Sequence, residues 1–145
     1  ADVGQRLWRL HVRAAEALIN HFAPQMTNGS HIVIIGSRTT RGAAGRSQYV
    51  ATKAALVGMV RSWAAELAPR GITANVVAPG ATQTPMLNAP GRASSPPNMP
   101  PIGRLIEPRE VAALVGFVLS ADAAAITGPE LVMCGGASLK QGAVL

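Results

Sequence analysis

The chain has 145 residues, of which 48% are hydrophobic and 14% are charged, and its net charge is +6. This length allows one domain with a sizeable core, and the apolar content excludes a disordered segment. The eleven arginines and two lysines are scattered, aromatic residues make up 3%, and no nucleic-acid-binding motif is visible, so we expect no nucleic-acid partner.

The sequence shows no sign of a membrane or secreted protein. No apolar run approaches the ~20 residues of a membrane-spanning helix, and the first residues lack the basic start and apolar stretch of a signal peptide. The single cysteine, Cys134, excludes an internal disulfide and is typical of a reducing compartment. We therefore expect a cytoplasmic protein without membrane contacts.

The first third of the chain predicts a helix, a strand and a loop. Apolar residues recur at helical spacing over residues 4–23, up to Pro24. A continuous β-branched run follows at residues 32–35, which is typical of a strand buried on both faces of a parallel sheet. Residues 37–46 are small and polar and predict a loop.

A second helix is predicted from Ser47 to about Ala68, and it has apolar stripes on two sides. Such a helix must be covered twice, so we expect its own sheet on one side and a partner subunit on the other. Residues 72–78 predict the next strand, and residues 81–106 predict a long irregular stretch.

The chain closes with one more helix and one more strand. Pro108 opens a helix that runs to about Ser120, with glutamates around its first turn. Residues 130–134 predict the last strand. Because strands alternate with helices, we expect parallel strands joined by right-handed crossovers.

Tyr49 and Lys53 are the most informative pair in the sequence. They lie four residues apart in the second predicted helix, so both side chains lie on one face. A free tyrosine titrates near ~10, and a nearby ammonium group favours the phenolate form. The pair therefore suits general acid–base catalysis, although this spacing also occurs by chance in ordinary helices.

Short motifs on both sides of this pair follow one another along nearly the whole chain. They are Gly36-Ser37, Gly42, Tyr49-x-x-x-Lys53-Ala54-Ala55-Leu56, Glu66-Leu67-Ala68-Pro69-Arg70-Gly71-Ile72, Asn75 to Met86, Gly103-Arg104, Pro108 to Ala112, Ile126-Thr127-Gly128 and Gly135-Gly136. Together they resemble the short-chain dehydrogenase/reductase family, in its bacterial ketoacyl-reductase-like branch. The resemblance implies an α/β fold with a Rossmann-type doubly wound parallel sheet, of which this chain would be the carboxyl-terminal half with three strands and three main helices.

The resemblance also implies a reaction, which moves a hydride between NAD or NADP and the carbonyl or alcohol of a small molecule. Tyr49 would be the general acid–base, and Lys53 would hold the nicotinamide ribose hydroxyls and favour the Tyr49 phenolate. Ser37 would hydrogen-bond the substrate carbonyl, at the carboxyl end of a strand where open α/β sheets bind ligands. A turn or capping serine is the simpler alternative, and the separation between Ser37 and Tyr49 is one residue shorter than the commonest family pattern.

Residues 79–84 resemble the segment of the family that contacts the nicotinamide. Pro79 and Gly80 would allow a close approach of the backbone, the Thr82 amide would meet the carboxamide, and Thr84 would add a hydroxyl group. A Pro-Gly turn that merely ends a strand is the alternative. Residues 81–106 would be the variable substrate loop, and we expect no metal site.

Several residues depart from the family pattern or leave their role open. His11 stands where relatives often have asparagine, and it either binds a water and titrates near neutral pH or is purely structural. Arg38, Arg41 and Arg46 either contact an anionic substrate or are solvated loop residues or subunit contacts. We expect Cys134 to be a small buried side chain away from the motifs, not a nucleophile.

The glycine-rich turn that seats a pyrophosphate on a helix N-terminus is missing from the sequence. Residues 1–145 are therefore expected to be a single partial domain, either the remainder of a full enzyme or a truncated product that cannot hold the dinucleotide alone. The leading hypothesis is an NAD(P)-dependent oxidoreductase that forms a homodimer or homotetramer. The alternative is a non-catalytic fragment that acts only in subunit assembly.

Overall fold

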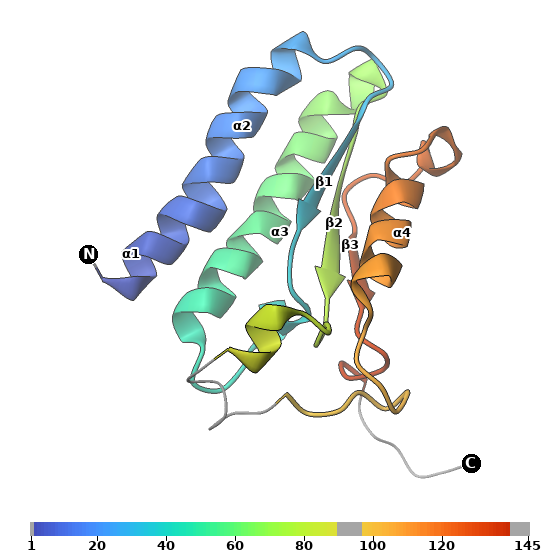
Figure 1. Ribbon diagram of the computed structural model, residues 1–145. Coiled ribbons are helices and arrows are strands. Elements are labelled where there is room, and N and C mark those ends of the chain that lie inside the picture. The colour runs from blue at the N-terminus through green and yellow to red at the C-terminus, as the bar shows by residue number, and fades with distance from the viewer. Residues whose placement is uncertain (1, 90–96, 140–145) are drawn as a thin grey trace.

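The computed structural model describes residues 2–89 and 97–139, which form a parallel sheet with helices on both of its faces (Figure 1). The strands are β1 (His31–Ile35), β2 (Thr73–Pro79) and β3 (Glu130–Met133), in the spatial order β1-β2-β3. Both pairings are parallel, with Ile34 opposite Val76 and Pro79 opposite Met133. The predicted α/β class, strand number and parallel pairing are confirmed.

The amino-terminal helix is continuous but not uniform. It consists of α1 (Val3–Trp8), a π-helical turn η1 (Arg9–Arg13) and α2 (Ala14–Phe22). The predicted helix over residues 4–23 is therefore confirmed, whereas its periodicity did not reveal the π turn. In a π turn each backbone hydrogen bond spans five residues instead of the four of an α-helix. Such turns often lie at functional sites.

The second long helix, α3 (Ser47–Leu67), ends where the sequence predicts it. A 3₁₀ turn, η4 (Ala68–Arg70), follows, and Gly71 closes it with a φ of +65°. A residue with a side chain is strained in this left-handed conformation, so glycine is the natural stop signal here.

The last helix, α4 (Pro108–Val118), begins with a reciprocal cap. The Glu107 side chain accepts the N–H of Glu110, and the Glu110 side chain accepts the N–H of Glu107. The remaining short elements are 3₁₀ turns: η2 (Ala23–Gln25), η3 (Arg38–Arg41), η5 (Pro85–Asn88) and η6 (Ala121–Ala123).

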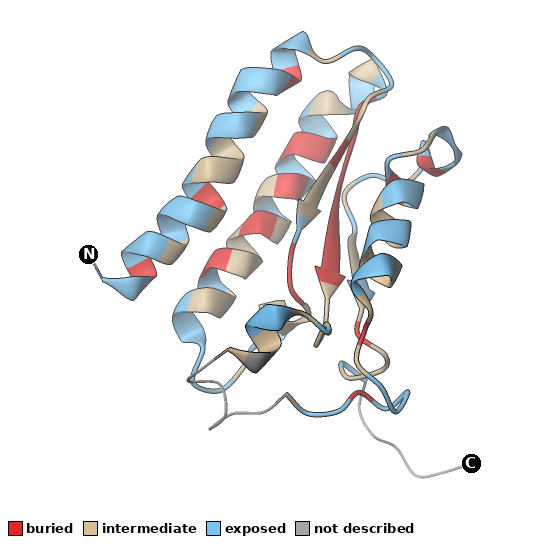
Figure 2. Cartoon of the chain, in the orientation of Figure 1, coloured by how far each residue is buried: buried red, intermediate tan, exposed pale blue. Residues whose placement is uncertain are grey.

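The core lies between α3 and the sheet, and β2 is its most buried element (Figure 2). Val60 and Trp63 of α3 pack with Ile32 of β1 and with Val76 and Ala78 of β2. Helix α4 covers the other face of the sheet (Figure 1).

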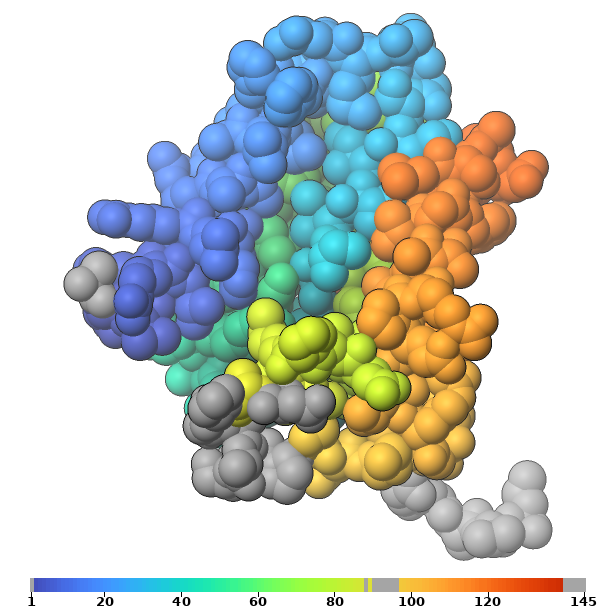
Figure 3. Space-filling model, in the orientation of Figure 1, coloured from blue at the N-terminus to red at the C-terminus, as the bar shows by residue number. Residues whose placement is uncertain are grey.

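Strand β1 is less well covered than β2. Its atoms lie open on the face seen in Figure 3, between the amino-terminal helices and α4. Ile35 keeps 47% of its surface exposed, although the β-branched run at residues 32–35 predicts a strand buried on both faces. That prediction is wrong for the end of β1, because the described elements leave the Ile35 side chain partly uncovered.

The two apolar stripes of α3 are both partly buried. Leu56, Val60 and Trp63 of the first stripe are buried, and so is Ala64 of the second, whereas Val50 and Val57 are half-buried and Val57 packs against the core. The partner subunit expected over the second stripe stays a prediction. Within residues 2–89 and 97–139, no helix combines the length and the apolarity needed to cross a bilayer.

Candidate active site

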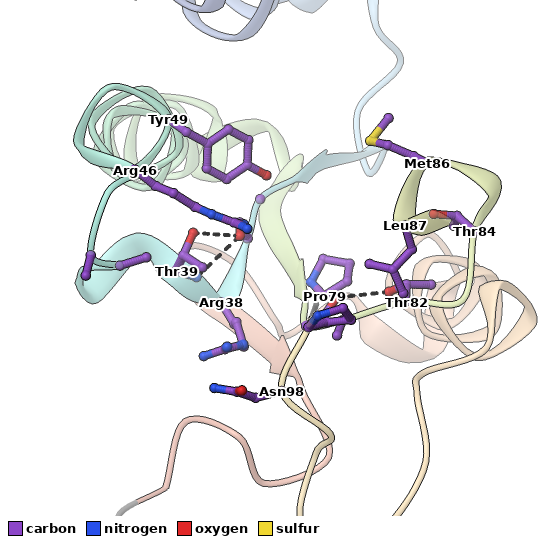
Figure 4. Close-up of a pocket in the computed structure, with 17 residues that line it drawn as sticks. Arg38, Thr39, Arg46, Tyr49, Pro79, Thr82, Thr84, Met86, Leu87 and Asn98 are labelled. Carbon is purple, nitrogen blue, oxygen red and sulfur yellow. Dashed lines mark hydrogen bonds between the residues drawn. The ribbon is translucent and has the colours of Figure 1, made fainter. Parts of the chain in front are cut away.

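A cavity of about 700 Å³ opens at the carboxyl ends of β1 and β2 (Figure 4). It is bounded by the segment after β1, the start of α3, and the segment that leads from β2 into η5. Six of the seven site residues expected from the sequence line it: Ser37, Tyr49, Pro79, Gly80, Thr82 and Thr84. The seventh, Lys53, lies outside its wall. Part of the predicted substrate loop, residues 90–96, lies outside the described residues.

Tyr49 is held at the start of α3 with its ring directed into the cavity (Figure 4). The ring meets the His11 imidazole edge-on, with 5.7 Å between the ring centroids and an interplanar angle of 84°. The Lys53 Nζ atom lies 5.9 Å from the centroid of the Tyr49 ring. The helical spacing predicted from the sequence therefore places phenol and ammonium close together.

Lys53 donates from Nζ to the Ile35 carbonyl oxygen at 3.0 Å. Gly36 donates its N–H to Val77 of β2, and backbone groups alternate along a strand, so the Ile35 carbonyl points to the opposite edge of β1. Lys53 thus satisfies a carbonyl on the edge of β1 away from β2. Burial lowers the pKa of the Lys53 ammonium group.

His11 is joined to the turn that carries Tyr49 through Thr52, a residue that sequence reasoning missed. The Thr52 hydroxyl donates to the Tyr49 carbonyl oxygen at 2.9 Å, and Nδ1 of His11 lies 2.9 Å from the same hydroxyl oxygen. A hydroxyl has one proton to donate, so His11 must be the donor to Thr52. A neutral imidazole that makes this contact therefore carries its proton on Nδ1.

Burial, and then the positive charge of Lys53, hold the pKa of His11 below its usual 6.5. The imidazole is therefore mostly uncharged at neutral pH. His11 lies in the π turn η1, which presents it to α3. The structure places His11 in contact with Tyr49 and Thr52, and the two roles left open by the sequence stay predictions.

Ser37 is buried just beyond β1 and caps the 3₁₀ turn η3. Its Oγ atom accepts the N–H of Thr39 at 3.3 Å and lies 2.9 Å from the Thr39 hydroxyl. Both residues line the cavity. The capping serine and the cavity serine are therefore the same residue, and Thr39 is a second hydroxyl group that sequence reasoning did not single out.

The segment after β2 is fixed by backbone contacts. Gly80 donates its N–H to Met133 at 2.8 Å, and the Thr82 hydroxyl donates to the Gly80 carbonyl at 3.0 Å. A bridge between Thr82 and Ile106 then ties the segment to the chain that leads into α4. Thr84 follows on the cavity wall.

The sequence led us to expect Cys134 away from the motifs, and this prediction is wrong. A Cβ on Gly80 would come within 3.0 Å of the Cys134 Cα and Cβ atoms, so Gly80 permits a close approach of two protein segments. Cys134 is buried, as predicted. Burial raises the pKa of its thiol, but hydrogen bonds from Ser138 and from backbone N–H groups outweigh this effect and leave the pKa lowered.

The three arginines of the loop differ in whether they line the cavity. Arg38 and Arg46 line the cavity, whereas Arg41 does not. No aspartate or glutamate is among the described lining residues. In the part of the chain that the structure describes, no group of three histidine, cysteine or carboxylate side chains is placed to hold a metal.

Residues 2–138 match the profile of the enoyl-(acyl carrier protein) reductase family. The chain belongs to the short-chain dehydrogenase/reductase family. Among curated relatives of this family, it is 46% identical over 109 residues to the 3-oxoacyl-[acyl-carrier-protein] reductase FabG of Vibrio harveyi. That match covers 72% of this chain and 44% of the relative.

Solved structures share the fold, among them a short-chain dehydrogenase/reductase. The enzyme of Serratia marcescens superposes with a TM-score of 0.85 at 33% identity, covering 93% of this chain and 56% of that one. A blue fluorescent protein from a metagenomic library, in complex with NADPH, gives 0.76 at 36% identity and covers 87% and 52% of the two chains. The chain thus spans about half the length of the relatives it matches.

Proposed function

We propose that this chain provides the catalytic side of an NAD(P)-dependent oxidoreductase that interconverts a carbonyl and an alcohol. One observation carries the proposal: Ser37 and Tyr49, both of which have hydroxyl groups, line a single cavity at the carboxyl ends of β1 and β2. In parallel sheets this edge is the usual ligand site. The NADPH bound to one structural neighbour, and the reductase activity named for FabG, support the same reading.

The residues present fit the nicotinamide end of such a cofactor. A cavity of about 700 Å³ is within the usual size of a small-molecule site. Its wall includes the backbone from Pro79 to Thr82 and the Thr84 hydroxyl, which would hold the carboxamide and nearby groups. The described residues contain no glycine-rich phosphate turn, so we assign to this partial domain the nicotinamide and substrate side of a Rossmann-type domain.

The cofactor, when bound, supplies the hydride, and the side chains of this chain manage the proton and the orientation. Ser37 donates a hydrogen bond to the substrate carbonyl and thereby polarises it. Tyr49 protonates the developing alkoxide from its phenol, or accepts the alcohol proton in the reverse direction. Lys53 favours the phenolate by its charge and would bind the ribose hydroxyls, a role that requires it to share or leave the Ile35 carbonyl.

We further propose that the protein assembles as a homodimer or homotetramer. Trp8, Leu18 and Phe22 of the amino-terminal helix keep about half of their surface exposed, at 45%, 57% and 52%. Large exposed apolar side chains on one helix are a candidate surface for another subunit.

Tyr49→Phe tests the proposed reaction. The unaltered chain is mixed with NADPH and the neutral ketone ethyl acetoacetate, and turnover is followed by NADPH absorbance. The variant should lose about 10²–10⁴-fold in rate while NADPH affinity, measured by fluorescence titration, changes little. Ser47→Ala, an exposed position outside the cavity wall, is the matched control and should leave both unchanged.

Retained turnover in Tyr49→Phe would overturn the role given to Tyr49. If the unaltered chain neither binds NADPH nor reduces a ketone, the proposed activity of this chain is rejected in favour of a non-catalytic assembly fragment. Tight NADPH binding would exclude that fragment.

A further inference from the structure

The wall of the cavity is positively charged. Its described residues include the guanidinium groups of Arg38 and Arg46 and no carboxylate, and the Lys53 Nζ atom lies 5.9 Å from the centroid of the Tyr49 ring. The first turn of α3 also contains no acidic residue. A cavity lined in this way has a positive potential, which favours an anionic ligand.

Arg38 belongs to the architecture of the wall. Its Cδ atom lies 3.3 Å from the position that a Cβ on Gly80 would occupy, so its stem packs over the Gly80 backbone. This contact holds the stem against the end of β2 and leaves the guanidinium group facing the cavity, on the side of Asn98 in Figure 4.

Arg46 approaches from the other side. It precedes the first residue of α3, and its side chain extends inward beneath the Tyr49 ring (Figure 4). Arg46 and Tyr49 line the same cavity, so a group bound by Arg46 would lie in the space that the Tyr49 ring faces.

Four arginines outside the cavity bind other groups of the protein, whereas Arg6, Arg9, Arg41 and Arg61 have no ion pair or side-chain hydrogen bond within the described residues. Arg13, Arg104 and Arg109 pair with glutamates, and Arg70 binds backbone carbonyls. No ion pair or side-chain hydrogen bond joins Arg38 or Arg46 to another residue within the described ranges 2–89 and 97–139. Their donors are available to a ligand, and the planar guanidinium fork matches a carboxylate.

We propose that the cavity selects a short oxo acid, in which a carboxylate lies near the reacting carbonyl, and that Arg46 and Arg38 bind this carboxylate. The inference rests on the proposed function, because it names the substrate class of the same site. The carbonyl of the oxo acid faces Ser37 and Tyr49, and its carboxylate faces the arginines.

Direct binding tests this inference independently of turnover. The 145-residue chain is titrated with acetoacetate and with acetoacetamide, its uncharged counterpart of nearly the same shape, by NMR at constant ionic strength. Acetoacetate should bind at least about tenfold more tightly, and Arg46→Gln should remove most of that preference, because a hydrogen bond to a charged group is worth about one factor of ten or more. Arg38→Gln should remove a smaller part.

Arg41→Gln is the matched control, because Arg41 lies in the same loop outside the cavity wall. It should leave the preference unchanged, which separates a specific site from the net charge of the loop. Equal binding of the two probes, or an equal loss in Arg41→Gln and Arg46→Gln, would overturn the inference.

The two proposals fail separately. Binding of acetoacetate that depends on Arg46, without reduction by NADPH, would reject the proposed reaction and keep the anion site. Reduction of ethyl acetoacetate with no preference for acetoacetate, and no effect of Arg46→Gln, would keep the reaction and reject the oxo acid.

Discussion

The two ends of the sheet use arginine in opposite ways. At the amino ends of the strands, Arg70 donates to the carbonyls of Ala23 and Met26 and to the side chain of Asn28, and its own carbonyl accepts the N–H of Gly29. At the carboxyl ends, Arg38 and Arg46 line a cavity. At the amino end, the guanidinium group of Arg70 is hydrogen-bonded within the protein. At the carboxyl end, the guanidinium groups of Arg38 and Arg46 face a cavity.

This difference separates stability from function. Backbone groups at the amino end do not bind a ligand, so they form their hydrogen bonds within the protein. At the carboxyl end, hydroxyl and guanidinium groups must remain able to bind a ligand. Substitutions at the amino end should therefore change the free energy of unfolding, whereas those at the carboxyl end should change binding.

Ile72→Ala should give the largest loss of stability. Ile72 precedes β2 at the amino end and is 1% exposed, so truncation leaves a cavity in the core. Such substitutions reduce the free energy of unfolding by about 2–5 kcal/mol. Urea denaturation measures it, with Met99→Ala, 61% exposed, as the control. Equal effects of the two substitutions would contradict the packing of this end.

Arg70→Met should have the next largest effect. The substitution keeps the apolar stem but removes the donors to the carbonyls of Ala23 and Met26. Leaving such acceptors without partners costs about 1–3 kcal/mol. Thermal unfolding of Arg70→Met is compared with that of Arg61→Met, an exposed position in α3. A loss no greater than that of the control would show that Arg70 does not stabilise this end.

The pH dependence of stability should carry a smaller contribution from His11. Because the pKa of His11 is lowered in the folded state, the unfolded chain binds more protons below pH 6.5. Stability from the neutral imidazole is therefore complete above pH 6.5 and declines as the pH falls below it. Unfolding of the unaltered chain and of His11→Asn at several pH values measures this, and the variant should show a shallower decline. An equal decline of stability with pH in the two proteins would show that His11 does not contribute to the pH dependence.

Arg38→Gln and Arg46→Gln should have the smallest effect on stability. Both side chains face the cavity without an ion pair among the described residues, so each change should stay within about 0.5 kcal/mol. The same urea denaturation provides the measurement. A loss as large as that of Arg70→Met would mean that Arg38 and Arg46 stabilise the fold through contacts within the protein.

Periodicity and turn residues predicted most of the fold. The helix ends at Pro24, Gly71 and Pro108 follow from local backbone chemistry, and the alternation of strands and helices implied the parallel sheet that the structure shows. The exposure of Ile35 could not be predicted in this way, because it depends on which elements pack against that face of β1.

The candidate site likewise contains local contacts, which the sequence predicts, and long-range contacts, which it does not. Tyr49 and Lys53 are one helical turn apart, so their proximity is a local property of α3 that the sequence alone determines. The contact between His11 and Thr52 spans 41 residues, and that of Lys53 with Ile35 spans 18. Such contacts depend on how helices pack against the sheet, which local patterns do not contain.

The sequence by itself determined the elements, their order and the pair at the start of α3, because backbone preferences and helical spacing act over a few residues. Only the tertiary structure decided that Cys134 lies against Gly80, that Arg38 and Arg46 share a cavity while Arg41 does not, and that a neutral His11 carries its proton on Nδ1. Each of these results depends on groups far apart in the chain, which packing alone brings within contact distance.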